Sequence, residues 1–406
     1  MLYRRPPSRF GINSLSVKLS LLISSICLIA GVCAAFFMLK SEEKQLVFEE
    51  HEVLKSSTDL LVRQFKERIE TKVNIAKQAN NIVNEQLFQK NSPIDLTSKA
   101  QLQFNSDGTI RSASSDGLSA AFLPQEKYSP FYKQLFNNSE ALWDVISPTL
   151  VYDFYNFYLI TNDDFIRISP PNWALNAPAD FRVSGGSTYK YVRESLGNSV
   201  EPEWSKVYYD RVWHDWVISL LVPIYSNNEF IGVTGSDITL NKLVSFLPIG
   251  DKEKNLLVFD SKGQLLAHPD LSTSLLAEYG KNNKKVAMDE FVNPQLKSII
   301  SEAIATKLPE YASSFLQNDE AHLINIQKID QLDWYIGVYK KRSSTLSALQ
   351  DLKLKFFGLF ILYAILVALL LHQALQHLVL RRLHSLVYAV SSFGQGKLDT
   401  QFPEEN

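Results

Sequence analysis

Residues 216–238 read WVISLLVPIYSNNEFIGVTGSDI, and this stretch decides the local fold. Two runs rich in β-branched and aromatic residues, 216–225 and 230–238, flank the four polar residues SNNE. β-branched and aromatic side chains favour strands, and a short Asn-containing turn between two such runs predicts a β-hairpin.

The runs upstream of this hairpin extend the same pattern. LWDVISPTLVY (142–152), FYNFYLI (154–160) and DFIRIS (164–169) are also rich in aromatic and β-branched residues, so we expect strands there. Residues 239–247 predict a short helix that ends at Pro248. Together these elements predict a module built on an antiparallel sheet.

A second, smaller cycle of the same kind begins at residue 255. NLLVFDSKGQLLAHP (255–269) predicts two strands joined by a turn at 260–263, and residues 288–307 predict a helix. HLINIQKI (322–329) and WYIGVYK (334–340) then predict a second strand pair. The expected fold class is therefore α+β, with two antiparallel-sheet modules.

A long helix is predicted before the first module. Residues 41–88 contain neither Pro nor Gly, and Leu46, Val53 and Leu60 recur at seven-residue steps. This pattern predicts one helix of about 45 residues, about 65 Å long. A helix of that length serves as a stalk, as a dimer seam, or as a spine against which sheets pack.

Two apolar runs flank this region and predict membrane spans. Residues 19–39 form an uncharged run of 21 residues, and FFGLFILYAILVALLL at 356–371 lies within the second span, 354–375. The first run is longer than the apolar part of a cleaved signal peptide, so we expect a retained anchor. Basic residues precede the first span and follow the second, which predicts that both termini are cytoplasmic. These residues are Arg4, Arg5, Arg9, Lys18, Arg381, Arg382 and Lys397.

Composition excludes several classes of function. The chain has 41 basic and 43 acidic residues and a net charge of −2, which gives no basis for nucleic-acid binding. Both cysteines, Cys27 and Cys33, lie in the first span. Neither disulfides nor cysteine-ligated zinc is therefore expected in the segment between the two spans. The seven histidines have no metal-site spacing, and no nucleophile elbow or phosphate-binding loop occurs. We expect neither an enzyme nor a cofactor or metal.

The order of span, long helix, larger module, smaller module and span resembles the double-Cache sensor domain of bacterial transmembrane receptors. Segments that carry the resemblance are WSKVYYD (204–210), PIY (223–225), GVTGSDI (232–238), VFDSKGQLLAHP (258–269) and DWYIGV (333–338). The resemblance implies two PAS-like modules, of which the membrane-distal one binds a small ligand in the periplasm. It also implies a homodimer in the bacterial inner membrane.

The resemblance implies a ligand site at Tyr208, Asp210 and Asp237. Two carboxylates facing one cavity hold an ammonium group, and Trp204 and Tyr208 add cation–π attraction. Two structural alternatives remain open. Asp237 has the position of a cap for the helix at 239–247, and Asp210 that of a turn residue.

One departure from the family concerns the ligand. Amino-acid-binding members carry Arg-x-Trp-Tyr upstream of the Tyr-x-Asp segment, whereas residues 185–193 here read GGSTYKYVR and include Tyr189. Arg167 or Arg193 is a candidate substitute, and each is equally explained as a salt-bridge partner. The predicted ligand is thus an amine, an amino acid or an organic acid, and the predicted site adds Tyr189 and Arg167.

The segment after the second span resembles the first helix of a HAMP linker, with a juxtamembrane amphipathic helix as the alternative. Leu383, Leu386, Val390 and Phe393 recur at steps of three and four. We expect a receptor that signals to a cytoplasmic output, of diguanylate cyclase, histidine kinase or chemotaxis type, on a longer chain or a separate partner. The alternative is a membrane-anchored scaffold.

The sequence predicts five parts of the chain. They are a cytoplasmic N-terminus (1–18), a first span (19–39), a periplasmic sensor domain (41–353), a second span (354–375) and a partial HAMP linker (376–406). The sensor domain consists of a long helix (41–90), a distal module (91–250) and a proximal module (251–343).

Overall fold

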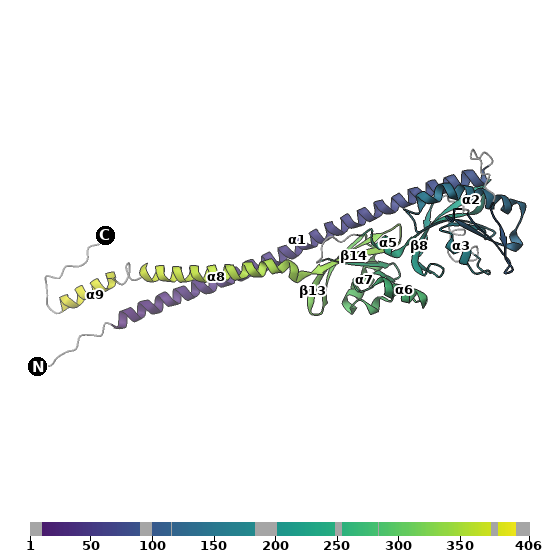
Figure 1. Cartoon of the computed structure of the whole chain (residues 1–406). Coiled ribbons are helices and arrows are strands. Elements are labelled where there is room, and N and C mark those ends of the chain that lie inside the picture. The colour runs from purple at the N-terminus through teal and green to yellow at the C-terminus, as the bar shows by residue number, and fades with distance from the viewer. Residues whose placement is uncertain are drawn as a thin grey trace. The chain divides into compact units, whose positions relative to one another are not determined.

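The computed structural model describes residues 10–89, 100–114, 116–182, 201–247, 254–282, 284–374 and 381–394. The chain divides into two compact units, residues 51–341 and residues 1–50 with 342–406. The unit at 51–341 combines a long helix with two antiparallel sheets, which confirms the predicted α+β class (Figure 1).

Helix α1, Phe10–Phe88, includes the predicted long helix and continues through the first predicted span. Past residue 50 it contacts both sheets. The Asn80 side chain donates to the backbone oxygen of Val222 at 2.8 Å, and the Phe65 and Trp334 rings lie 6.3 Å apart. Of the three roles left open by the sequence, this part of α1 acts as a spine for the sheets (Figure 1).

The larger sheet contains nine described strands, all paired antiparallel, in the order β1-β2-β3-β5-β4-β9-β8-β6, with β7 also on β8. The strands are β1 Gln103–Phe104, β2 Thr109–Ala113, β3 Ala120–Pro124, β4 Asn156–Thr161, β5 Ile166–Ser169, β6 Glu203–Trp204, β7 Tyr208–Asp210, β8 Asp215–Ser226 and β9 Glu229–Thr239. We call this sheet with its helices the distal module.

Strands β8 and β9 form the predicted hairpin. Asn227 and Asn228 have φ of 50° and 64°, the left-handed pair that a tight two-residue turn requires. A register shift follows at Ile224 and Tyr225, and beyond it Ser219 pairs with Asp237. The hairpin prediction is therefore confirmed, and the bulge fixes which residues face each other.

The predicted strand at 142–152 is wrong, because residues 130–150 form helix α2, Pro130–Leu150. Ser129 caps this helix by accepting from the Tyr132 amide, and Pro130 occupies its first turn, where a missing N–H costs nothing. Of the aromatic and β-branched residues that imitated a strand, Trp143 and Ile146 are buried on one helix face, whereas Val145 and Thr149 are exposed. The other helices described in this module are η1 Gln125–Lys127, α3 Asn172–Asn176 and α5 Leu240–Val244.

The part of the proximal module that the structure describes has five strands, paired antiparallel in the order β11-β10-β14-β13-β12. Its predicted turn at 260–263 is confirmed, since Asp260 Oδ1 accepts the amides of Lys262 and Gln264 at 2.9 and 2.8 Å. The elements are β10 Lys254–Asp260, β11 Leu265–Ala267, α6 Thr273–Lys281, η2 Met288–Glu290, α7 Pro294–Thr306, β12 Glu310–Gln317, β13 Glu320–Ile329 and β14 Trp334–Lys341.

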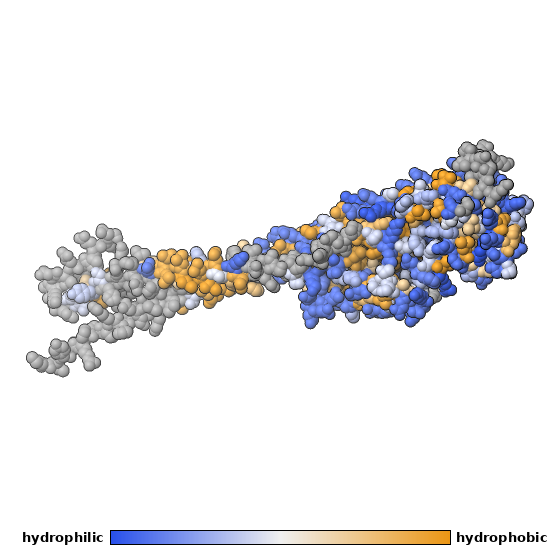
Figure 2. All heavy atoms as spheres, viewed as in Figure 1, coloured by the Kyte–Doolittle hydropathy of each residue, from blue (hydrophilic) through white to orange (hydrophobic). Residues whose placement is uncertain are grey.

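The other unit combines the first part of α1 with α8, Arg342–Ala374, and α9, Arg381–Gly394. Gly31 of α1 lies against the Phe360 ring of α8, so its small size serves a contact within the chain. Exposed apolar side chains gather on the described part of α8 (Figure 2). Among the helical residues that the structure describes, none forms a helix long and apolar enough to cross a membrane. The predicted spans and HAMP linker remain predictions.

Candidate functional site

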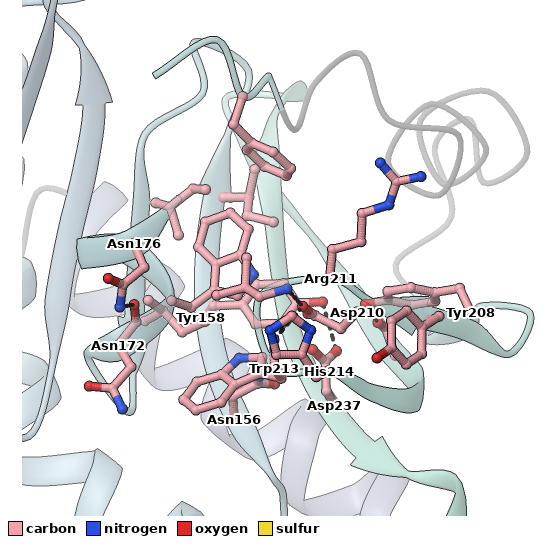
Figure 3. A pocket seen from close by; sticks show the side chains of 18 of the residues that line it. Asn156, Tyr158, Asn172, Asn176, Tyr208, Asp210, Arg211, Trp213, His214 and Asp237 are labelled. Carbon is pink, nitrogen blue, oxygen red and sulfur yellow. Dashed lines mark hydrogen bonds between the residues drawn. The ribbon is translucent and has the colours of Figure 1, made fainter. Parts of the chain in front are cut away.

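The distal module contains a cavity of 940 Å³, within the range of about 300–1,000 Å³ typical of ligand sites. It lies on the sheet face that α3 covers. Helices α1 and α2 bond to the opposite face, through Asn80 to Val222 and through the Trp143 indole to Phe157. Figure 3 shows Tyr208, Asp210 and Asp237 close together on one side of the cavity and Asn172 and Asn176 of α3 on the other.

The sheet lines the cavity in three rows of cross-strand neighbours. The polar row contains Asn156 of β4, Asp237 of β9 and Ser219 of β8. Two residues further along each strand, the middle row contains Ile168, Tyr158, Gly235 and Leu221, and the apolar row beyond it contains Ile166, Ile160 and Val233. Alternate residues of a strand face one side, so this register sets the three rows side by side.

Asp237 is the chemical centre of the polar row. Its side chain is buried and accepts a hydrogen bond of 3.0 Å from the Tyr158 hydroxyl. Burial, reinforced by the charge of Asp210, raises the pKa of Asp237 to about 7, although the neighbouring polar groups of Ser219, Tyr158 and Asn156 favour its charged form. Among the described residues no Lys or Arg forms an ion pair with it. A cationic group in the cavity would therefore give the charged form of Asp237 a partner.

Gly235 makes this arrangement possible. A Cβ at Gly235 would collide with the Tyr158 ring, so only glycine lets that ring lie across β9. From there the Tyr158 hydroxyl reaches Asp237, two residues along the strand. Burial raises the pKa of Tyr158 well above its ordinary value, so the phenol stays a proton donor at neutral pH.

The other carboxylate, Asp210, shapes the loop beside the cavity. Its Oδ1 accepts the backbone amides of Val212 and Trp213 at 2.7 and 3.0 Å. Asp210 thus has the turn role considered as an alternative, and it also lines the cavity. Asp237, in contrast, is not the cap of the following helix, because Thr239 caps α5.

Three buried polar atoms of the cavity lining have no hydrogen-bond partner among the described residues: Asn156 Oδ1, the Tyr209 hydroxyl and Trp213 Nε1. An unpaired buried polar atom is costly and calls for an explanation. Asn156 Oδ1 only accepts and Trp213 Nε1 only donates. A ligand that presents both an N–H donor and an acceptor would satisfy them.

The other predicted site residues lie elsewhere. The prediction that Arg167 lines the ligand site is corrected by the structure, because Arg167 is fully buried on the opposite face of the sheet. There it donates to Ser139 Oγ and to the Phe136 backbone oxygen at 3.1 and 2.9 Å. It also lies 3.8 Å from Glu140. It stands between Ile166 and Ile168, both of which line the cavity, so strand alternation turns it away.

Trp204 is likewise absent from this cavity. It lines a separate hollow of 490 Å³ with residues of α1, among them Glu70. Tyr189 and Arg193 lie outside the described residues, as does the whole 185–193 stretch. Of the six predicted residues, the structure thus brings Tyr208, Asp210 and Asp237 together.

Sequence reasoning missed Asn156, Tyr158, Ser219 and Trp213. Ser219 was within reach, since the hairpin places it opposite Asp237 once the bulge is known. Asn156 and Tyr158 had no local signal, because the pairing of β4 with β9 joins residues about 80 positions apart. Within the described residues no group of three or more acidic, His or Cys side chains is placed to hold a metal ion.

Comparison with known families supports the resemblance over part of the chain. Residues 175–245 match the family model of the first PDC sensor domain of methyl-accepting chemotaxis protein-like proteins. The match includes Tyr208, Asp210 and Asp237. The predicted resemblance to a receptor sensor domain is confirmed over this segment, and the matched family is a sensor domain rather than an enzyme. A search of curated protein sequences finds no match.

Several solved structures are similar to the chain. The ligand-binding domain of Mlp24 with asparagine is 16% identical, with a TM-score of 0.46, and covers 77% of this chain and 99% of its own. The domain of the Pseudomonas aeruginosa PAO1 amino acid chemoreceptor PctB with L-Arg is 13% identical, with a TM-score of 0.45 and coverages of 73% and 97%. The domain of the Campylobacter jejuni chemoreceptor Tlp3 with L-norvaline is 15% identical, with a TM-score of 0.45 and coverages of 74% and 94%.

Proposed function

We propose that this chain is the sensory part of a transmembrane receptor, and that its distal cavity binds a small ligand carrying an ammonium group. One observation carries the proposal. A buried carboxylate, Asp237, and an unpartnered acceptor, Asn156 Oδ1, are cross-strand neighbours facing one cavity. Two adjacent acceptors, neither of them ion-paired among the described residues, suit a group with several N–H donors.

The ligand classes expected from the sequence differ in how well they match this lining. An amine or an amino acid supplies the ammonium group, and Trp213 Nε1 offers a donor for a ligand acceptor such as a carboxylate. An organic acid without an amino group would have Arg211 as a cationic partner in the lining, but a negative charge beside Asp210 and Asp237 would be repelled. Amines and amino acids are therefore favoured in the polar row.

The remainder of the proposal concerns signal transmission. The exposed apolar residues of α8 support a second span at 354–375, and the long apolar run at 19–39 supports the first. The sensor domain then lies in the periplasm, and both termini lie in the cytoplasm. Binding shifts the domain between two packings, and the second span transmits this movement to a cytoplasmic output in a homodimer.

The competing function, a membrane-anchored scaffold, predicts a distal module whose interior is filled by its own side chains. A cavity of 940 Å³ with unpartnered polar atoms favours the receptor. A scaffold gains nothing from leaving such atoms unpaired, because each costs about 1–3 kcal/mol.

Thermal unfolding of the full chain in lipid nanodiscs tests the proposal against panels of amines, amino acids and organic acids. A ligand at 100 times its dissociation constant stabilises by about 2.7 kcal/mol. We expect hits among the amines and amino acids that Asp237→Asn abolishes. The matched control is Asp144→Asn. Asp144 lies outside the cavity and is half-buried, and burial raises the pKa of its carboxyl to about 6. Hits that survive Asp237→Asn would contradict the site.

A further inference from the structure

The polarity of the cavity changes in one direction along the strands. On β9 the cavity-facing residues run from Asp237 through Gly235 to Val233, and on β4 they run from Asn156 through Tyr158 to Ile160. Both strands therefore begin at a polar side chain and end at an aliphatic one. The four residue steps from Asp237 to Val233 correspond to about 13 Å along a strand.

The sheet wall in the far part of the cavity is apolar, whereas Asn172 and Asn176 of α3 line the side opposite Asp237 (Figure 3). Ile160, Ile166 and Val233 form this sheet wall, and Trp173 packs on them as part of one hydrophobic cluster. Phe181 and Val212 pack against the same cluster and also line the cavity. A polar group placed against this sheet wall would find no hydrogen-bond partner among its side chains.

We propose that the ligand is an elongated amphipathic cation, with an ammonium group in the polar row and a bulky hydrocarbon body extending along the strands to the apolar row. This inference rests on the proposed function, because it assumes that the ammonium group binds at Asp237. It adds the hydrocarbon body of the ligand, which Ile160, Ile166 and Val233 would contact and select.

The size of the cavity supports this assignment. An ammonium group held by Asp237 and Asn156 occupies only the polar row, which leaves the middle and apolar rows uncovered. Apolar surface of this extent contributes to affinity only if a ligand removes it from water. A small amine such as ethylamine would leave it hydrated, whereas a longer one would cover it.

Calorimetric titration of the full chain in nanodiscs with a series of straight-chain amines, from ethylamine to hexylamine, tests the inference. Empty nanodiscs supply the blank for partitioning into lipid. The affinity should rise about fourfold for each added methylene, the equivalent of about 0.8 kcal/mol per buried CH₂. Hexanol, which has the same hydrocarbon body without the ammonium group, should bind far more weakly than hexylamine.

Two matched valine variants locate the hydrocarbon body. Val233→Thr puts a hydroxyl into the apolar row and should weaken hexylamine about tenfold while leaving ethylamine unchanged. Val222→Thr makes the same change on β8, on the face that bonds to Asn80 of α1, and should change neither affinity. Both variants replace a buried valine of the same sheet, so they share the cost to folding.

The outcomes separate the two proposals. Amines that bind in an Asp237-dependent way with equal affinity at every length would overturn the amphipathic ligand and keep the ammonium site. Equal effects of Val233→Thr on ethylamine and hexylamine would also overturn it. If folded protein binds no amine of any length, the ammonium site itself is wrong, and the further inference falls with it.

Discussion

The two sheets of this protein use buried polar side chains in opposite ways. In the proximal sheet, Gln327 donates to Asp59 of α1 at 2.6 Å, and Asn325 donates to Glu310 at 2.9 Å. In the distal sheet, Asn156 and Asp237 are equally buried but face a cavity, and Asn156 Oδ1 has no partner among the described residues. Polar groups satisfied inside the protein stabilise the fold, whereas those left unsatisfied are available to a ligand.

The faces of the two sheets that lie away from α1 differ in the same sense. In the proximal sheet the Phe259 and Tyr335 rings stack at 5.2 Å, and Ile324 and Ile326 fill the space around Gly337. In the distal sheet the corresponding face holds the cavity. One sheet architecture therefore supports a packed core in one module and a binding site in the other.

The largest expected effect is the pH dependence that Asp237 gives to the ligand-free protein. The unfolded chain releases this proton near pH 3.8, whereas the folded protein holds it until about pH 7. The folded state therefore binds more protons between these values, and its stability falls as the pH rises through them, by roughly 4 kcal/mol in all.

Urea unfolding of the full chain between pH 4 and pH 8 measures this effect. Asp237→Asn cannot titrate, so the variant should lose this part of the pH dependence and be more stable than the wild type at pH 8. Substitution of Gln327 or Asn325 in the proximal sheet should leave the dependence of stability on pH unchanged. Equal slopes for wild type and Asp237→Asn would mean that the carboxyl is charged and compensated in the folded protein.

The next largest effect is on ligand binding. Removing the Asp237 charge should weaken an amine about 100-fold, because hydrogen bonds to charged groups contribute about 1.5–3 kcal/mol and a buried ammonium would lose its counter-charge. Equilibrium titration of hexylamine into wild type, Asp237→Asn and Asp144→Asn measures the difference. We expect Asp144→Asn to bind hexylamine as the wild type does. Comparable losses of affinity in both variants would mean that the substitutions act by disturbing the fold.

A pair of glycine substitutions contrasts the two sheets directly. Gly235→Ala forces the Tyr158 ring aside, so it should cost about 1–3 kcal/mol of stability and weaken amine binding. Gly337→Ala in the proximal sheet meets only ordinary contacts, the nearest at 3.5 Å, and should change stability by less than about 1 kcal/mol. Thermal unfolding and amine titration of both variants test this. If Gly235→Ala changes neither stability nor amine affinity, the position of the Tyr158 ring is not required for the site.

The smallest effect concerns the satisfied polar contacts of the proximal sheet. Gln327→Ala removes the donor to Asp59 and should cost about 1 kcal/mol of stability with amine affinity unchanged. Gln331→Ala, at an exposed position nearby, is the control and should cost little. A loss of amine affinity in Gln327→Ala alone would mean that the proximal sheet takes part in binding, contrary to the comparison.

The sequence predicted those elements whose pairing is local. The hairpin at 216–238 and the strand pair at 322–340 join neighbouring runs through short turns, so the residues on each side identify the partners. Helix α2 was mistaken for a strand because its aromatic and β-branched residues have high strand propensity. Its start, Ser129 followed by Pro130, was the overlooked indication.

The candidate site was predictable only in part for the same reason. Tyr208, Asp210 and Asp237 were found through a resemblance, and the structure places them at one cavity. Asn156 and Tyr158 come from β4, which reaches β9 through a non-local pairing that no spacing in the sequence reveals. Arg167 was predictable as a non-ligand, because it alternates with two isoleucines that point the other way.

In the proposed site, Asp237 exchanges its proton for the cationic group of a ligand. The most direct measurement is the number of protons released when hexylamine binds the full chain at pH 7, obtained by calorimetry in buffers of different ionisation enthalpy. With a pKa of about 7, Asp237 is half protonated, so we expect release of about half a proton per amine bound and none from Asp237→Asn. Tight binding to the wild type without proton release would contradict it.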